Sequence, residues 1–176
     1  MNKFLHLFMV LIAIFLATVR PVWADPPTEN QIKSAYVLNF IKFVDWPAGV
    51  SEGKVTLCVM GNDPLGGALS ALDGRKASAR EIHIRPVKYD DELKGCHVLF
   101  IGESEQRRLT AIIKTLNDAP VLTISDIENF AQRGGIIGLL SHENRIVFEV
   151  NLASARSEKL ILSGQMLNLA IQIFGK

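Results

Sequence analysis

The sequence predicts an α/β fold: a three-layer, Rossmann-like sandwich with a mostly parallel sheet, helices on both faces and an antiparallel C-terminal hairpin. Three observations predict it. Strand-like runs alternate with segments of helical periodicity, as in βαβ units. Two of these runs, KVTLCVMG and HVLFIG, are almost entirely apolar, which is typical of strands buried on both faces. Near the C-terminus, IIGLL and RIVFEVNL flank a short polar connection, which predicts the hairpin.

The first 24 residues have the pattern of a cleaved secretory signal. Lys3 precedes an apolar run from Phe4 to Ala17, and Val22–Ala24 supplies the small residues expected at the −3 and −1 positions. The alternative is a membrane anchor, but the apolar run is shorter than the ~20 residues that a spanning helix needs. We therefore expect residues 25–176 to form a single exported domain.

The first predicted helix has an N-cap at Thr28 and ends just before Pro47. Its apolar residues fall on two adjoining faces and cover an arc about twice the ~100° of an ordinary surface helix. One interpretation is that one face packs on the sheet while the other contacts a partner or a second copy. The alternative is that sheet and C-terminal helix enclose this helix within the monomer. The candidate contact residues are Tyr36, Val37, Phe40, Ile41, Val44 and Trp46.

The middle of the chain supplies the remaining strands and their connecting helices. Strands are predicted at residues 54–61, 80–87, 97–102 and 121–124. Helices are predicted from Pro64 to about Leu72, from about Glu105 to Leu116 and from Asp126 to Gln132. After the hairpin, LILSGQMLNLAIQIF (residues 160–174) predicts a final helix that packs on the sheet.

The balance of charged residues bears on the class of partner, and the cysteine content bears on disulfide formation. Removing Lys3 and Arg20 with the signal leaves 17 basic against 18 acidic side chains, and this balance argues against a nucleic-acid partner. Cys58 and Cys96 are the two cysteines of the chain. An oxidising compartment favours a disulfide between them, and two buried free thiols are the alternative. If strands 54–61 and 97–102 are neighbours, as in a doubly wound sheet, the two cysteines come within bridging distance.

Motifs for catalysis are incomplete. The stretch GNDPLGG has the glycine spacing of a phosphate-binding loop, but Gly67 stands where its lysine would be. Ser104 lies at a strand-to-helix turn, yet the second glycine of G-x-S-x-G is missing. The histidines His83, His97 and His142 lie in no recognisable motif, and we find no metal-ligand spacing. We expect no catalytic residue, metal or cofactor.

A small-ligand binder is the alternative function that the fold allows. Ligands of open α/β sheets bind in the crevice at the carboxyl ends of the strands. Here that crevice would lie near Asn62-Asp63 and Glu103-Ser104.

Five stretches resemble, in order, the signature blocks of the YfiR-like family. They are SAYVLNFIKFVDWP, LCVMGNDPLGGAL, CHVLFIG, VLTISDIENFAQRGGIIGLL and VFEVNLASAR. The combination of F-V-x-W-P with the later F-A-x-R-G-G and F-E-V-N-L is specific, and the resemblance covers residues 31–170. On these motifs the chain is identified as a member of the family.

The resemblance implies a periplasmic, non-enzymatic regulator. YfiR-like proteins repress an inner-membrane diguanylate cyclase by engaging its periplasmic sensor region, and an outer-membrane OmpA-like lipoprotein can sequester the repressor. They also form homodimers. Cys58 and Cys96 match the family's early cysteine pair. The best-known member has a second pair in the segment aligned with residues 131–138, and this chain has no cysteine there, so a redox switch that depends on that pair is not expected.

Overall fold

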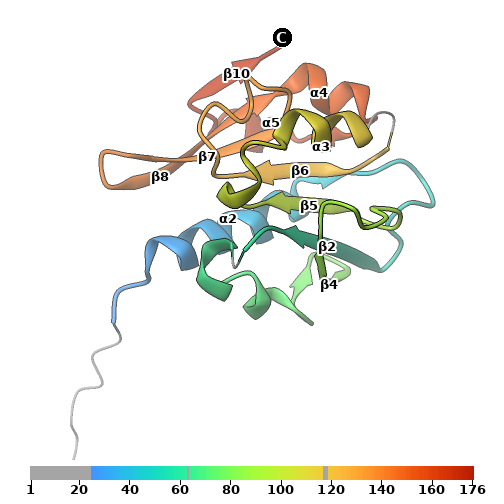
Figure 1. The fold of residues 1–176 in the computed structure, drawn as a ribbon, viewed down its shortest axis with the longest axis horizontal. Helices are drawn as coiled ribbons and strands as arrows, with labels where there is room; N and C mark the ends of the chain where they lie inside the picture. The colour runs from blue at the N-terminus through green and yellow to red at the C-terminus, as the bar shows by residue number, and fades with distance from the viewer. Residues whose placement is uncertain (1–24, 63, 117–118) are drawn as a thin grey trace, which may run out of the picture.

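The computed structural model describes residues 25–62, 64–116 and 119–176 (Figure 1). The predicted signal, residues 1–24, lies outside the described residues, and so does Asp63. The main sheet contains β2 (Lys54–Met60), β3 (Lys76–Ala77), β4 (Arg80–Val87), β5 (Val98–Ile101), β6 (Leu122–Ser125), β7 (Ile137–His142), β8 (Arg145–Asn151) and β10 (Gln172–Phe174). A small separate sheet pairs β1 (Val44–Asp45) with β9 (Ile161–Leu162).

The main sheet has the order β10-β8-β7-β6-β5-β2-β4-β3. Strands β4, β2, β5, β6 and β7 run parallel to one another, and β2 lies between β4 and β5. The strands predicted at residues 54–61 and 97–102 are therefore adjacent. The predicted class, an α/β fold with a mostly parallel sheet, is confirmed. Strands β7 and β8 pair antiparallel, from Ile137↔Val150 to His142↔Arg145, and β10 then adds to β8 in parallel.

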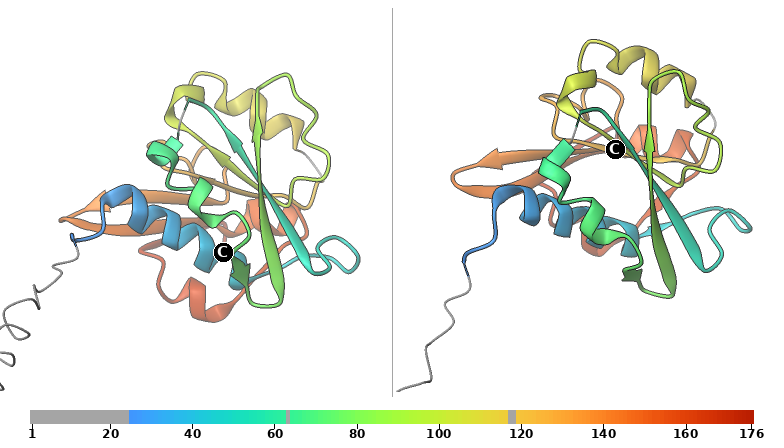
Figure 2. Two further views of the ribbon diagram at one scale, coloured as in Figure 1. Left: turned by 90° about the horizontal axis from the view of Figure 1, so that it is seen from below. Right: turned by 60° about the horizontal axis from the view of Figure 1, so that its bottom comes forward.

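Successive side chains along a strand point to opposite faces of the sheet, and each face packs in its own hydrophobic core. On β5, Val98 and Phe100 pack in the core that contains α2 (Glu29–Lys42), whereas Leu99 and Ile101 pack against α3 (Leu109–Thr115). Figure 2 shows α2 and α3 on opposite sides of the strands. Within the described residues, no helix is long and apolar enough to cross a membrane.

Helix α2 begins where the sequence predicts and ends earlier. Thr28 is its N-cap, and it forms a capping box with Gln31. The helix ends at Lys42 rather than next to Pro47, because residues 44–45 leave the helix and form β1, paired with β9. A strand partner that lies more than a hundred residues further along the chain overrides the local helical pattern.

The predicted final helix, residues 160–174, is wrong. The hydroxyl of Ser163 accepts a hydrogen bond from the Met166 backbone and starts α5, which spans only Gly164–Leu167. The amide of Ile171 then donates to the carbonyl of Phe148, so that the chain joins the sheet as β10. The apolar residues of this segment are therefore divided between a core contact, a short helix and an edge strand.

Three other connections differ from their predictions. Residues 126–132 form turns, because the Ser125 hydroxyl accepts from the Ile127 amide and holds a non-helical turn there. Helix α3 begins at Leu109 after a separate 3₁₀ turn, Glu103–Glu105. Residues 64–72 form two 3₁₀ turns, Pro64–Gly67 and Ser70–Leu72, instead of one helix. Helix α4 (Leu152–Ser157), capped by Asn151, is absent from the sequence-based prediction.

Candidate interaction site

The wide apolar arc of α2 is explained by packing on several sides within the monomer. One side faces the sheet, where Phe40 meets Phe148 of β8 at a ring-centroid distance of 4.9 Å. The same core includes side chains from residues 64–72, from β3 and from the C-terminal segment: Leu65, Leu69, Leu72, Ala77, Leu160, Leu162 and Met166. Figure 2 shows these segments beside the helix. The arrangement matches the alternative in which the helix is enclosed by the protein itself.

Most of the six candidate contact residues are therefore in the interior. Val37, Ile41 and Val44 have no exposed surface, and Phe40 and Trp46 are also buried. Tyr36 is half-buried, and its hydroxyl donates to the Ile146 carbonyl. The buried members of the set could reach a partner only if α2 left the core.

Trp46 anchors the segment that follows α2. Its indole Nε1 donates to the carbonyl oxygen of His97 at 3.2 Å, and the guanidinium of Arg80 lies 5.1 Å from its ring centroid. Arg80 also donates to the carbonyl of Val44 at 3.3 Å. The ring of His97 accepts from the Thr56 amide at Nδ1, so its Nε2 carries the proton and donates to the Val50 carbonyl. These contacts fix the start of β5 against β1 and β2.

Ion pairs and a hydrogen bond around the buried side chain of Lys33 join α2 to β7 and to the segment after β6. The ammonium of Lys33 bonds Asp126 at 2.9 Å and Glu29 at 3.0 Å, and Glu29 accepts from the Ser141 hydroxyl. Burial alone would lower the pKa of Lys33, but the hydrogen bonds and charges of its two carboxylate partners raise it. The Ser141 hydrogen bond and Lys33 lower the pKa of Glu29.

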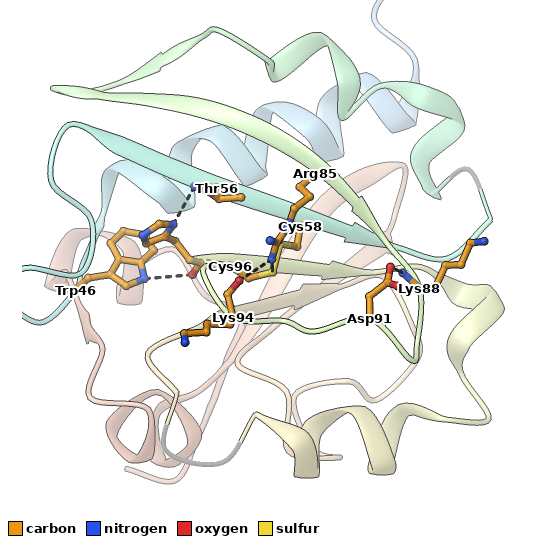
Figure 3. Close-up of a disulfide and its surroundings, with 9 residues drawn as sticks. Trp46, Thr56, Cys58, Arg85, Lys88, Asp91, Lys94 and Cys96 are labelled. Carbon is orange, nitrogen blue, oxygen red and sulfur yellow. Dashed lines mark hydrogen bonds between the residues drawn. A yellow bond between two sulfur atoms is a disulfide. The ribbon is translucent and has the colours of Figure 1, made fainter.

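Cys58 and Cys96 form a disulfide, as predicted (Figure 3). Cys58 is in the middle of β2, Cys96 lies just before β5, and their Cα atoms are 5.7 Å apart. Both residues are buried in the core that contains α3. The side chain of Arg85, on β4, contacts both sulfur atoms, a feature that spacing in the sequence does not reveal.

The crevice between β2 and β5 is narrow at the position predicted for a small ligand. The Ser104 hydroxyl accepts from the Asn62 amide across the crevice. A Cβ atom added to Gly61 would lie 2.8 Å from that hydroxyl oxygen, and one added to Gly102 would lie 3.0 Å from Pro64. The protein's own atoms therefore fill the crevice at this position and leave no room there for a ligand. An open cleft of about 490 Å³ lies next to it, and residues from the ends of β2 and β4 line it together with Arg108.

The exposed apolar side chains gather in a different segment. Ile161, Leu169 and Ile171 are 68%, 72% and 52% exposed, and they are three of the five exposed large hydrophobic residues among those described. Leu169 and Ile171 lead directly into β10, which pairs only with β8 and so leaves its other edge free within the described sheet. We call residues 161–174 the C-terminal edge. Sequence reasoning missed it, because the predicted helix at residues 160–174 would have contained no strand edge and would have packed Ile171 on the sheet.

Two comparisons place the chain among known proteins. The described fold is an α/β domain cross-linked by a buried disulfide, and no group of three or more acidic, histidine or cysteine side chains in the described ranges is arranged to hold a metal. The chain belongs to the YfiR/HmsC-like family, whose sequence model matches residues 30–171. This membership suggests a periplasmic regulator of cyclic di-GMP signalling, and the disulfide fits an oxidising compartment.

The fold is similar to that of a crystallised conserved domain protein from Vibrio cholerae O1 biovar El Tor. The TM-score is 0.55 at 12% identity, and the match covers 83% of this chain and 60% of that chain. At this identity, the likeness concerns the fold alone.

Proposed function

We propose that this protein is an exported, non-enzymatic regulator that represses an inner-membrane diguanylate cyclase by binding the cyclase's periplasmic sensor region. The family match across nearly the whole predicted domain, residues 25–176, is the observation that carries the proposal. Residues 1–24 are the export signal in this account, and they are removed on cleavage. The Cys58–Cys96 disulfide supports a location outside the cytoplasm.

We place the contact on the C-terminal edge rather than on the buried face of α2. Leu169 and Ile171 present apolar surface to solvent, and the free edge of β10 offers unpaired backbone groups to an incoming chain. A partner strand could add to such an edge, with the neighbouring apolar side chains filling pockets of the partner. The same edge is available for a homodimer or for an OmpA-like lipoprotein, and competition for it would relieve repression.

Binding to the cyclase's purified periplasmic region tests this proposal. Calorimetry with residues 25–176 should give a saturable complex, and Leu169→Asp together with Ile171→Asp should weaken it at least tenfold, because a charge would enter a desolvated contact. Lys114→Asp on α3 is the matched control, since it introduces the same residue on the opposite face of the sheet. Binding that is unchanged by the double substitution would remove the contact from this edge. No binding by the unsubstituted protein would contradict the proposed function itself.

The small-ligand alternative rests on the cleft of about 490 Å³ beside Arg108. Ligand binding there would raise the melting temperature in a saturable way. If no compound in a panel of periplasmic metabolites changes the melting temperature, the small-ligand alternative is excluded.

A further inference from the structure

A cleft of about 400 Å³ lies between α2 and the segment that follows β2. One wall is α2 between Asn30 and Leu38, and the other comprises residues 65–68 together with side chains as far along the chain as Arg75. Figure 2 shows this segment alongside α2. The volume is within the range of ~300–1,000 Å³ that is usual for small-ligand sites. We call it the α2 cleft, and it shares no lining residue with the cleft beside Arg108.

Small residues and an unusual turn shape the α2 cleft. Leu65 and Gly66 have φ angles of 56° and 54°, a left-handed conformation that is unfavourable for a residue with a Cβ atom such as Leu65. The turn brings Gly66 close to the helix, because a Cβ atom added there would lie 3.2 Å from Nδ2 of Asn30. Ala35 on α2 and Ala71 on the other wall also line the cleft, and neither side chain extends beyond Cβ. The two walls therefore leave a hollow that larger side chains would fill.

The lining of the α2 cleft has an apolar floor and carries a single charge. Three leucines that are at most 9% exposed form the floor: Leu38, Leu65 and Leu72. The exposed side chain of Arg75 is the one charged group among the described residues of the lining. By contrast, carboxylates as well as cations line the clefts beside Arg108 and Tyr36. The α2 cleft is therefore suited to an anion rather than to a cation.

The guanidinium of Arg75 is available to a ligand. The backbone of Arg75 is fixed, because its amide donates to the Leu72 carbonyl and its carbonyl accepts from the Ile82 amide. Its side chain forms no ion pair or hydrogen bond with any residue in the described ranges. The nearest carboxylate in the sequence, that of Asp73, accepts instead from the Ile84 amide. Since a guanidinium pairs with a carboxylate through two parallel N–H···O bonds, Arg75 can bind a carboxylate ligand in this way.

The helix wall adds a neutral donor. The side-chain oxygen of Gln31 accepts from the Thr28 amide in the capping box, which leaves the NH₂ group of Gln31 as a donor in the lining. A carboxylate oxygen accepts from such a group, so the donors of both walls favour the same kind of ligand.

We propose that the α2 cleft binds a small carboxylate with an apolar body. The carboxylate pairs with Arg75, and the apolar body packs on the three leucines, where it is removed from water. A single guanidinium balances the single charge of a carboxylate, whereas an amine would find no carboxylate partner in the described lining. The site does not overlap the C-terminal edge, and the inference does not rest on the proposed repression of a cyclase.

Titration of ¹⁵N-labelled residues 25–176 with 3-phenylpropionate, followed by two-dimensional NMR, tests this proposal. Saturable shifts should appear at the amides of residues 28–38 and 64–75. The dissociation constant should be on the order of 1 mM, as expected for a ligand of about eleven non-hydrogen atoms. Neutral 3-phenylpropionamide has the same apolar body and should bind at least tenfold more weakly. Acetate, which lacks the apolar body, should also bind at least tenfold more weakly.

Three variants locate the site. Arg75→Met should weaken binding of 3-phenylpropionate at least tenfold. Lys76→Met is the matched control, because it removes an exposed cation that does not line the cleft, and it should bind like the wild type. Ala35→Phe places a ring in the cleft from the exposed surface of α2 and should abolish binding while the rest of the spectrum is unchanged.

Four results would overturn the proposal. They are the absence of saturable shifts, shifts confined to the cleft beside Arg108, equal binding by Arg75→Met, and equal binding of the neutral amide. Arg75→Gln replaces Arg75→Met if the Met variant does not fold. The comparison of 3-phenylpropionate with its amide uses only the wild type, so it decides the role of charge even if both variants are unfolded.

Discussion

The carbonyl oxygen of His97 accepts two hydrogen bonds, one from the indole of Trp46 at 3.2 Å and one from the Leu122 amide at 2.9 Å. The first bond joins the segment after α2 to the residue just before β5, and the second joins that residue to the start of β6. Because the Leu122 amide remains, the carbonyl stays satisfied when the indole is removed. The contact of Trp46 with His97 therefore contributes less to stability than the packing of the ring itself.

Two substitutions of Trp46 separate these contributions. Trp46→Phe keeps most of the buried ring and should lower the free energy of unfolding by about 1 kcal/mol. Trp46→Ala also removes the surface on which Arg80 stacks and should lower it by about 3–5 kcal/mol. Urea denaturation measures both values. Equal losses for the two variants would contradict this division.

Ile41→Asp and Val44→Asp test whether α2 is wholly interior at these positions. Both side chains have no exposed surface, so either substitution buries a carboxylate without a partner. We expect a loss of more than about 4 kcal/mol and little folded protein. Asn39→Asp, on the exposed side of the helix, is the control and should fold normally. A folded Ile41→Asp monomer with altered association would show instead that this face contacts a partner.

Lys33→Met tests the ion pairs that Lys33 forms with Asp126 and Glu29. The side chain of Lys33 is 10% exposed, and its loss leaves Asp126 without its cation, so we expect a destabilisation of about 2 kcal/mol. The pKa of Lys33 is raised in the folded state, so its stabilisation is fully present below the unfolded pKa and is lost as pH rises through the folded value. The difference between wild type and Lys33→Met should therefore be constant near neutral pH and shrink under strongly alkaline conditions. A difference that grows with rising pH would refute this assignment.

Glu149→Gln should stabilise the protein at neutral pH. Burial raises the pKa of Glu149, which means that the folded state disfavours its carboxylate. The wild type therefore carries a small penalty above the folded pKa, and the penalty disappears as pH falls through that value. We expect a gain on the order of 0.5 kcal/mol at pH 7 and none in acid, measured by thermal denaturation. A destabilised variant at pH 7 would show that the carboxylate is held favourably.

Local signals made part of the fold predictable. Thr28 and Gln31 lie close in sequence, and their mutual hydrogen bonds depend only on the first helical turn. The apolar strand at residues 54–60 needs burial on both faces wherever it lies in the sheet. The C-terminal edge was not predictable in this way. The apolar residues of this segment do recur with a helical period. Its strands form because Val44 pairs with Leu162 and Phe148 bonds Ile171, and a local sequence pattern does not reveal partners so distant in the chain.

In the candidate sites, too, features set by local sequence were predictable and features set by distant contacts were not. The Cys58–Cys96 pair followed from the two cysteines and the expected adjacency of their strands. Arg85 did not, because its contact with the sulfurs depends on the register of β4 against β2, which no local pattern specifies. The burial of Val37, Ile41 and Val44 likewise depends on segments that fold over α2 from elsewhere in the chain.

The most direct test of the proposed function measures intracellular cyclic di-GMP in the organism that carries the gene, with and without it. We expect a clear rise in intracellular cyclic di-GMP when the gene is deleted. The rise should be reversed by the full-length gene, but neither by a version that lacks residues 1–24 nor by an exported version with Leu169→Asp and Ile171→Asp. An unchanged level of cyclic di-GMP on deletion, under conditions in which the protein is made, would contradict repression of a diguanylate cyclase.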